Sequence, residues 1–120
     1  NTLSTGYGFE IAIRDILPGE QITDDYGLLN IDTDMSCACR TDKCRWNIQS
    51  DDIAFFSDRW DALLKPAIAL VPGVEQPLLR YIDDSMWAEV LKYINTGRHY
   101  RSVSLLHYPG ILADPDVSLS

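Results

Sequence analysis

Three closely spaced cysteines are the sequence feature that most restricts how this chain can fold. Cys37, Cys39 and Cys44 follow the spacing Cys-x-Cys-x4-Cys. Thiolates at this spacing can surround one tetrahedral Zn²⁺ at about 2.3 Å, because short intervening segments bring the sulfurs together. An odd number of clustered cysteines suits a disulfide framework poorly and suits a metal site in a reducing compartment. We therefore predict a zinc site and an intracellular protein, nuclear in a eukaryote or cytoplasmic in a bacterium.

A structural zinc site needs one ligand more than these cysteines supply. The only histidines of the chain, His99 and His107, lie far downstream. An isolated histidine is more often a surface or core residue than a metal ligand, so the fourth ligand stays open. The alternative for the whole cluster is three reduced cysteines without metal.

The charge balance restricts the partners of the chain. Its 120 residues, enough for one domain with its own core, carry 18 acidic and 10 basic side chains, a net charge of -8. Direct nucleic-acid binding is not expected, because it relies on clustered Lys and Arg. An acidic surface suits basic partners such as lysine-rich tails, although the same charge can simply keep a protein soluble. No apolar run is long enough to predict a membrane segment.

The segment before the cysteines has the pattern of a strand, a turn and a second strand. In residues 8–13 the large apolar side chains alternate, as in a half-buried strand. Pro18 and Gly19 predict a type II turn, because proline fixes one central φ and glycine supplies the positive φ of the next. Residues 21–23 are a second short extended run, and residues 28–36 are a predicted loop.

From residue 51 onward the pattern becomes helical. Ser57 or Asp58 can cap a first helix, which Pro66 is expected to kink or divide. Asp83 or Asp84 can cap a later helix. With a short helical turn between them, these elements predict three short helices.

Three more expectations concern the end of the chain. Gly97 is predicted to end the last helix, because glycine adopts the required left-handed conformation readily. Residues 103–105 alternate Val and Leu with Ser, which predicts a last strand. Residues 113–120 are expected to be frayed.

Two motifs in a fixed order resemble a known family. Residues 15–21 read Asp-Ile-Leu-Pro-Gly-Glu-Gln, and residues 25–27 read Asp-Tyr-Gly, ten residues ahead of the first cysteine. This order resembles the C-terminal half of the SET-domain family of protein-lysine methyltransferases, where acidic-Ile-x-Pro-Gly-Glu-Glu and Asp-Tyr-Gly precede a post-SET Cys-x-Cys-x4-Cys. The resemblance covers residues 1–50.

The resemblance implies an α+β fold in three parts. Residues 1–34 would form the β-rich C-terminal portion of a SET domain, residues 35–50 a post-SET zinc-binding segment and residues 51–120 a helical C-terminal extension. It also implies an activity, the transfer of a methyl group from S-adenosylmethionine to a lysine of a substrate protein, for example in a basic tail.

Tyr26 resembles the active-site tyrosine of the family, whose hydroxyl lies beside the methyl group in flight. Such a transfer depends on in-line positioning, a neutral amine and oxygen acceptors around an electron-poor methyl. Desolvation in an apolar channel lowers the pKa of a lysine and so supplies the neutral amine. The alternative for Tyr26 is a buried tyrosine with a satisfied hydroxyl.

The resemblance places four further residues near the cofactor and substrate. Trp46 and Ile48 fall where the family packs against the adenine of the cofactor, and Asn1 falls at the end of a cofactor-binding Asn-His motif. The alternative for Trp46 is a core or hinge aromatic. Asp24 stands in the substrate channel where the family has Phe or Tyr; its carboxylate can hold the lysine as an ammonium, which opposes transfer, or point to solvent.

Family members carry two further motifs upstream of this stretch, a cofactor-binding Gly-x-Gly region and Asn-His-Ser-Cys-x-Pro-Asn, whose cysteine completes the zinc site, and the sequence does not include that upstream part. The resemblance therefore implies a fragment that is inactive alone, with a bare surface through which two copies could form a homo-oligomer; a monomer in light scattering would exclude that association. The alternative function is a non-enzymatic, zinc-stabilised protein-interaction module, with Tyr26 and Trp46 in its core.

Overall fold

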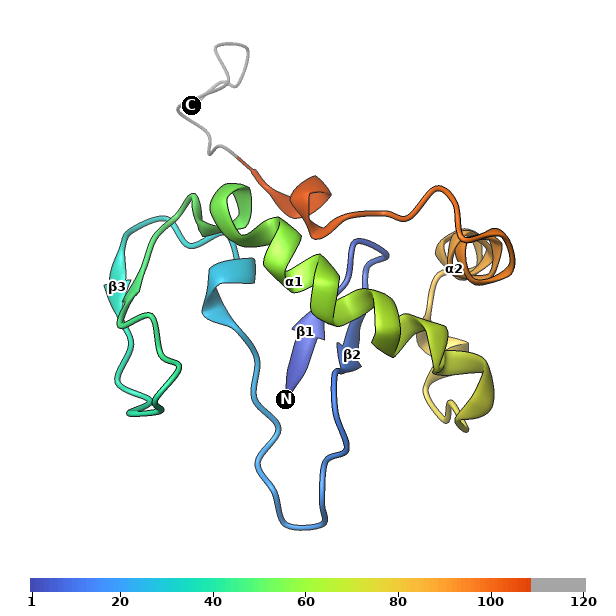
Figure 1. Ribbon diagram of the computed structural model, residues 1–120, viewed down its shortest axis with the longest axis horizontal. Coiled ribbons are helices and arrows are strands. Elements are labelled where there is room, and N and C mark those ends of the chain that lie inside the picture. The colour runs from blue at the N-terminus through green and yellow to red at the C-terminus, as the bar shows by residue number, and fades with distance from the viewer. Residues whose placement is uncertain (109–120) are drawn as a thin grey trace.

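One long helix, α1 (Asp52–Ala69), crosses the molecule and carries much of its core (Figure 1). The computed structural model describes residues 1–108. Two antiparallel strand pairs precede α1, and a second helix follows it. The remaining elements are β1 (Thr2–Ser4), β2 (Glu10–Ala12), β3 (Met35–Ser36), β4 (Asn47–Ile48), α2 (Asp84–Thr96) and short 3-10 helices at Tyr26–Leu28, Val71–Gly73, Leu79–Tyr81 and Val103–Leu106. The predicted α+β class is confirmed.

The N-terminal strands are shorter than predicted. β1 pairs antiparallel with β2, and Leu3 lies opposite Ile11. β2 covers three residues instead of the predicted 8–13. The chain turns between the strands at Gly8, whose φ of +83° is favourable for glycine. Residues 8 and 9 of the predicted strand therefore belong to the turn, and residues 10–12 pair with β1.

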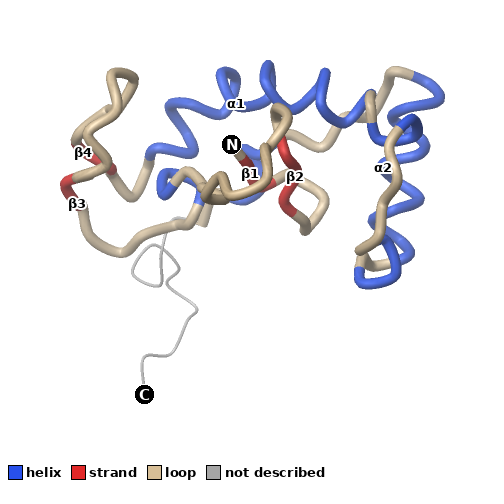
Figure 2. The backbone as a smooth tube through the Cα atoms, turned by 90° about the horizontal axis from the view of Figure 1, so that it is seen from below, coloured by secondary structure: helices blue, strands red, loops and turns tan. Residues whose placement is uncertain are grey.

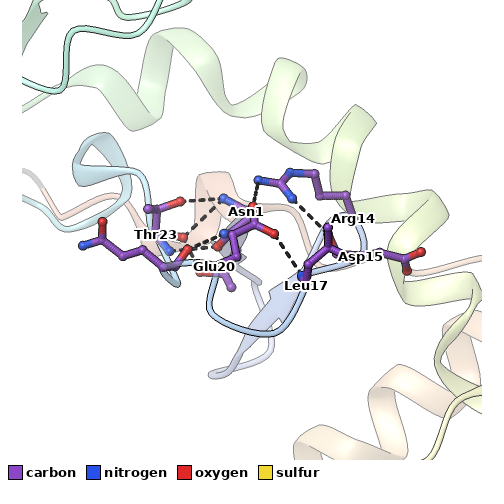
Figure 3. A network of polar contacts seen from close by, with 8 residues as sticks. Asn1, Arg14, Asp15, Leu17, Glu20 and Thr23 are labelled. Atoms are coloured by element: carbon purple, nitrogen blue, oxygen red, sulfur yellow. Dashed lines mark hydrogen bonds and ion pairs between the residues drawn. The ribbon is translucent and has the colours of Figure 1, made fainter.

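The turn at Pro18 and Gly19 is confirmed. The N–H of Glu20 donates to the carbonyl of Leu17 at 3.0 Å, and Gly19 has a φ of +82°, as a type II turn requires. Arg14 forms an ion pair with Glu20 across the turn (Figure 3). This pair and the N–H of Leu17 lower the pKa of Glu20 to about 2. Local contacts encoded by the motif thus fix the turn.

Residues 21–23 form no strand, in contrast to the prediction. They run beside β1, held by the side chain of Asn1 (Figure 3). Its Nδ2 donates to the carbonyl of Gln21 at 2.7 Å, and its Oδ1 accepts the N–H of Thr23 at 2.8 Å. The N–H of Thr2 donates to the carbonyl of Thr23 at 2.9 Å. Residues 21–23 form no regular hydrogen-bond ladder with β1, because the side chain of Asn1 takes part of their backbone hydrogen bonds.

The helix α1 begins earlier than predicted and is not divided. Ser57 and Asp58 lie inside it, Ser57 buried and Asp58 exposed. The helix also continues through Pro66. Proline cannot donate to the carbonyl of Ala62, but both residues lie on the exposed side, where water can bind that carbonyl. Among residues 1–108, no helix combines the length and apolarity needed to cross a membrane.

A buried stripe explains why α1 is long. Ile53, Trp60, Leu64 and Ile68 recur at helical spacing, and all are buried. The stripe packs against residues from both sides of the chain, namely Leu3, Tyr7, Leu28, Val90 and Val103. One core therefore joins the predicted SET portion to the predicted helical extension.

The helix α2 lies at the end of α1 that is remote from β3 and β4 (Figure 2). Asp83 caps it as predicted, and its carboxylate accepts the N–H of Met86 at 3.1 Å. Gly97 ends it with a φ of +67°, also as predicted. The predicted short helical turn between the two helices is confirmed as the 3-10 helix Leu79–Tyr81. The expectation that all three helices are short is wrong for α1, which has 18 residues.

The predicted strand at residues 103–105 is a 3-10 helix, Val103–Leu106. Ser102 caps it, because its hydroxyl accepts the N–H of Ser104 at 3.0 Å, and Val103 is buried. A side-chain cap of this kind favours a helical turn over a strand. The predicted frayed end at 113–120 lies outside the described residues.

Asp61 fastens this C-terminal segment to α1. Its buried carboxylate accepts hydrogen bonds from the hydroxyl of Tyr100 at 2.8 Å, the hydroxyl of Ser102 and the N–H of Val103 at 3.1 Å. Burial, followed by the contact with Asp61, raises the pKa of Tyr100. The phenol therefore stays protonated and donates.

We expect Asp61→Ala to lower the free energy of unfolding by about 3 kcal/mol, because buried donors lose a charged acceptor. Urea unfolding followed by tryptophan fluorescence, to which the buried Trp60 contributes, measures the change. Asp58→Ala on the exposed side of α1 is the control and should stay within about 0.5 kcal/mol of the unsubstituted chain. Equal effects of the two substitutions would contradict the role of Asp61.

Candidate metal centre and the adjoining Asp-Tyr-Gly turn

The strand pair β3–β4 brings the cysteines together. Met35 lies opposite Ile48 and Ser36 opposite Asn47. One step further, the N–H of Cys37 donates to the carbonyl of Trp46 at 2.7 Å. The chain between the strands, residues 37–46, is therefore a closed loop, which we call the cysteine loop. It lies near the start of α1 (Figures 1 and 2).

The three sulfurs in this loop are close enough to bind one metal ion. The Sγ atoms of Cys37, Cys39 and Cys44 all lie within 4.8 Å of one another. Sulfurs that bind one tetrahedral zinc at about 2.3 Å lie about 3.8 Å apart. A small contraction of the loop would reach that geometry, so the cluster is compatible with zinc.

Hydrogen bonds and burial shift the pKa values of the thiols in opposite directions. The hydroxyl of Thr41 lies 3.3 Å from Sγ of Cys39, and this contact together with the Thr41 backbone lowers the pKa of Cys39 to about 6. The N–H of Trp46 donates to Sγ of Cys44 at 3.3 Å and lowers the pKa of Cys44, but Cys39, burial and Cys37 raise it to about 11. The thiols thus compete for protons, and a divalent cation that binds the thiolates releases those protons.

The described residues 1–108 add no His, Asp or Glu to the three cysteines. His99 and His107, the histidine candidates from the sequence, therefore do not complete the cluster in this structure. The described residues therefore bring together three sulfur ligands, one fewer than a structural zinc site needs.

The turn that carries Tyr26 is tied to the cysteine loop. Asp25 caps the 3-10 helix Tyr26–Leu28, and its Oδ1 accepts the N–H of Gly27 at 2.9 Å. The same carboxylate binds both terminal nitrogens of Arg45, at 2.8 and 2.9 Å, and accepts from Nε1 of Trp60 at 3.3 Å. Burial raises the pKa of Asp25, but the bonds from Arg45 outweigh it, and the pKa lies below its usual value. Asp25 is therefore an ionised anchor at neutral pH.

Gly27 leaves the space that this anchor needs. A Cβ atom at this position would lie 2.7 Å from Nη2 of Arg45 and 2.9 Å from Cη2 of Trp60. Neither neighbour can easily move, because Arg45 is bound to Asp25 and Trp60 is buried. The Asp-Tyr-Gly sequence thus has a packing reason for its glycine and a capping reason for its aspartate.

Tyr26 and Trp46 are on the surface. Tyr26 is 50% exposed and Trp46 is 57% exposed. The alternatives of a buried tyrosine at 26 and a core aromatic at 46 are therefore wrong. Ile48 is buried at 5% exposure and presents almost no surface to a ligand. Trp46 adopts a positive φ of 65°.

A cavity of about 240 Å³ adjoins this anchor. Its lining includes Asn1 and Asp24, predicted for the cofactor and the substrate channel, together with Arg45, Arg59 and Trp60. The structure therefore brings Asn1 and Asp24 to one cavity beside Arg45. The other predicted site residues, Tyr26, Trp46 and Ile48, do not line it.

Asp24 is only partly open to solvent. Burial raises its pKa to about 6, the N–H of Asp25 opposes this shift, and the neighbouring carboxyl of Glu10 adds to it. At neutral pH Asp24 is mostly ionised and can attract a cation. The two roles considered for this carboxylate, holding a lysine ammonium and pointing to solvent, both stay predictions.

Arg45 was not found by the sequence patterns, although it follows the last cysteine directly. Its importance lies in contacts with Asp25, 20 residues earlier, and Asp52, 7 residues later. A charged residue between two motifs is a common surface feature, and only the folded chain shows which carboxylates it reaches. The sequence signal for this ion pair is a basic residue directly after Cys44 and an acidic residue directly before Tyr26.

Comparison of the chain with protein-family models, with curated proteins and with solved structures gives no match. The cysteine cluster is compatible with a post-SET segment. The resemblance to SET-domain enzymes therefore stays a prediction that rests on the order of the two motifs.

We expect the reduced chain to bind one Zn²⁺ per molecule through Cys37, Cys39 and Cys44. Cys39→Ser should weaken binding at least about 100-fold, because even residues behind a metal ligand contribute 10- to 100-fold. Competition with a chromogenic chelator measures the affinity, and Ser36→Ala in β3 is the control. Unchanged affinity in the Cys39 variant would show that zinc binds elsewhere.

We expect Gly27→Ala to lower the free energy of unfolding by about 1–3 kcal/mol, because the added methyl group overpacks a closed site. Gly73→Ala is a matched control, since a Cβ at Gly73 meets no atom within 4 Å. Denaturant unfolding of both variants measures the difference. A Gly27 variant as stable as the Gly73 variant would refute the packing role of Gly27.

Proposed function

We propose that this chain forms part of a zinc-containing, S-adenosylmethionine-dependent protein-lysine N-methyltransferase, with Tyr26 beside the transferred methyl group. The observation that carries the proposal is the bidentate bond between Asp25 and Arg45. It places the Asp-Tyr-Gly turn against the cysteine loop, so the two motifs that resemble SET-domain enzymes are neighbours in space as well as in order.

The position of Tyr26 supports a role at an open reaction site. Its side chain is half exposed, and its backbone is fixed because its carbonyl accepts the N–H of Leu29 at 3.1 Å. S-adenosylmethionine, when bound, supplies an electron-poor methyl group. An accessible phenol oxygen on a held backbone can accept weak C–H···O contacts from such a group and so help to hold it in line.

Other surface features agree with a cofactor and a basic substrate. Trp46 presents an exposed indole on the cysteine loop, a face suited to stacking with an adenine ring. Asp24 and Asn1 line the cavity beside Arg45. The net charge of -8 favours the approach of a lysine-rich segment.

We expect the full-length protein that contains this sequence to methylate lysine in at least one of a panel of basic peptides. Tyr26→Phe should lower kcat by about tenfold or more, because it removes an oxygen that acts in the transition state. Mass spectrometry of the peptides measures methyl transfer. Tyr81→Phe, at an exposed tyrosine outside the proposed site, should leave kcat unchanged. If the unsubstituted protein neither transfers methyl groups nor binds the cofactor, the proposal is wrong.

A second candidate function, a zinc-stabilised protein-interaction module, is favoured by the large apolar side chains on the surface. Phe55 is 72% exposed, Tyr81 70% and Leu78 68%. Exposed apolar groups of this size often mark a contact with another protein, including a second copy of the chain. Binding of S-adenosylmethionine to the full-length protein separates the two functions, because the module has no need of a cofactor.

A further inference from the structure

Arg45 extends from the cysteine loop to the turn that carries Tyr26. It follows Cys44 directly, and its guanidinium binds Asp25 at 2.8 and 2.9 Å and Asp52 at 3.4 Å. The side chain is 22% exposed. Hydrogen bonding to Asp25, despite burial, raises the pKa of Arg45, so the arginine keeps its charge.

Aromatic rings fix the orientation of this guanidinium. Its central carbon lies 5.1 Å from the centre of the Phe56 ring and 5.5 Å from that of Trp60. Such cation–π contacts favour one orientation of a planar group. Because the carboxylate of Asp25 is bound by both terminal nitrogens, a shift of Arg45 breaks two bonds together.

The link is the single polar connection between the two sites among residues 1–108. No other hydrogen bond or ion pair in this part joins the cysteine loop to residues 24–28. The loop itself is closed by a strand pair of two residues each and by the bond from Cys37 to Trp46. A loop held this weakly gains order when a metal ion fixes its sulfurs.

We propose that Arg45 is a positioning residue that couples metal binding at Cys44 to the conformation of the turn carrying Tyr26. A metal ion bound to Cys44 fixes the backbone from which Arg45 extends. Arg45 then holds Asp25, which caps the helical turn that begins at Tyr26. The catalytic meaning of the coupling rests on the proposed function, whereas the coupling itself does not.

The coupling must act in both directions, because the effect of one site on another is reciprocal in free energy. If metal binding orders the turn, an intact bond between Arg45 and Asp25 must strengthen metal binding. Both effects can be measured on the chain without a methyl donor or a substrate.

The experiment measures zinc affinity and backbone amide exchange for the unsubstituted chain and the variants Arg45→Met, Arg45→Lys and Asp25→Asn. Amides of Gly27, Leu28 and Leu29 report the turn, since each donates a hydrogen bond within it. We expect zinc to slow their exchange about tenfold in the unsubstituted chain and not in Arg45→Met, and Arg45→Met to weaken zinc binding about tenfold. Arg45→Lys should lose less zinc affinity than Arg45→Met, because lysine keeps the positive charge but cannot bind the carboxylate through two nitrogens.

Arg59→Met is the matched control, because Arg59 lines the same cavity and is exposed. The double variant of Arg45 and Asp25 should bind zinc as weakly as either single variant, since both remove one interaction. Asp25→Asn takes the place of Arg45→Met if the latter does not fold.

Two results would overturn the proposal: zinc slowing the three amides equally in Arg45→Met and the unsubstituted chain, or additive losses of zinc affinity in the double variant. Intact coupling in a full-length protein that transfers no methyl group would reject the methyltransferase and keep the coupling.

Discussion

The bond between Arg45 and Asp25 is the interaction on which the organisation of the candidate site depends. It joins the residue after the last cysteine to the residue before Tyr26, and through Asp52 it reaches the first turn of α1. It is half-buried, bidentate and flanked by aromatic rings, which makes it much stronger than a pair of exposed charges. Three separate segments are thereby held in one arrangement.

The helix α1 gives these segments a common support. Its buried stripe packs on the N-terminal strands on one side and on the C-terminal 3-10 helix on the other. Asp61 adds a polar connection to that C-terminal segment from within the same helix. A chain with strands of only two or three residues can hold together in this way, because a long helix supplies the apolar surface that short strands lack.

The candidate site combines three cysteines that lie close enough to bind one metal ion with an exposed tyrosine. The sulfurs already lie within 4.8 Å, so metal binding needs little rearrangement of the loop. Tyr26 and Trp46 face solvent instead of filling the core. Aromatic residues at half exposure on fixed backbone are typical of binding surfaces, and this distinguishes them from Trp60, which has a structural role under the turn.

The sequence determined the features that depend on neighbours along the chain: the α+β class, the turn at Pro18 and Gly19, the cap at Asp83, the helix end at Gly97 and the convergence of the three cysteines. Their physical causes are fixed torsion angles, side-chain caps and short ligand spacing, all of which act over a few residues. The tertiary structure alone decided the rest. Residues 21–23 form no strand because the side chain of Asn1 takes part of their backbone hydrogen bonds. Pro66 lies inside a helix that its buried face stabilises. Arg45 binds Asp25, which is 20 residues away in the sequence. Each of these outcomes depends on contacts between segments far apart in sequence, whose energies no local pattern contains.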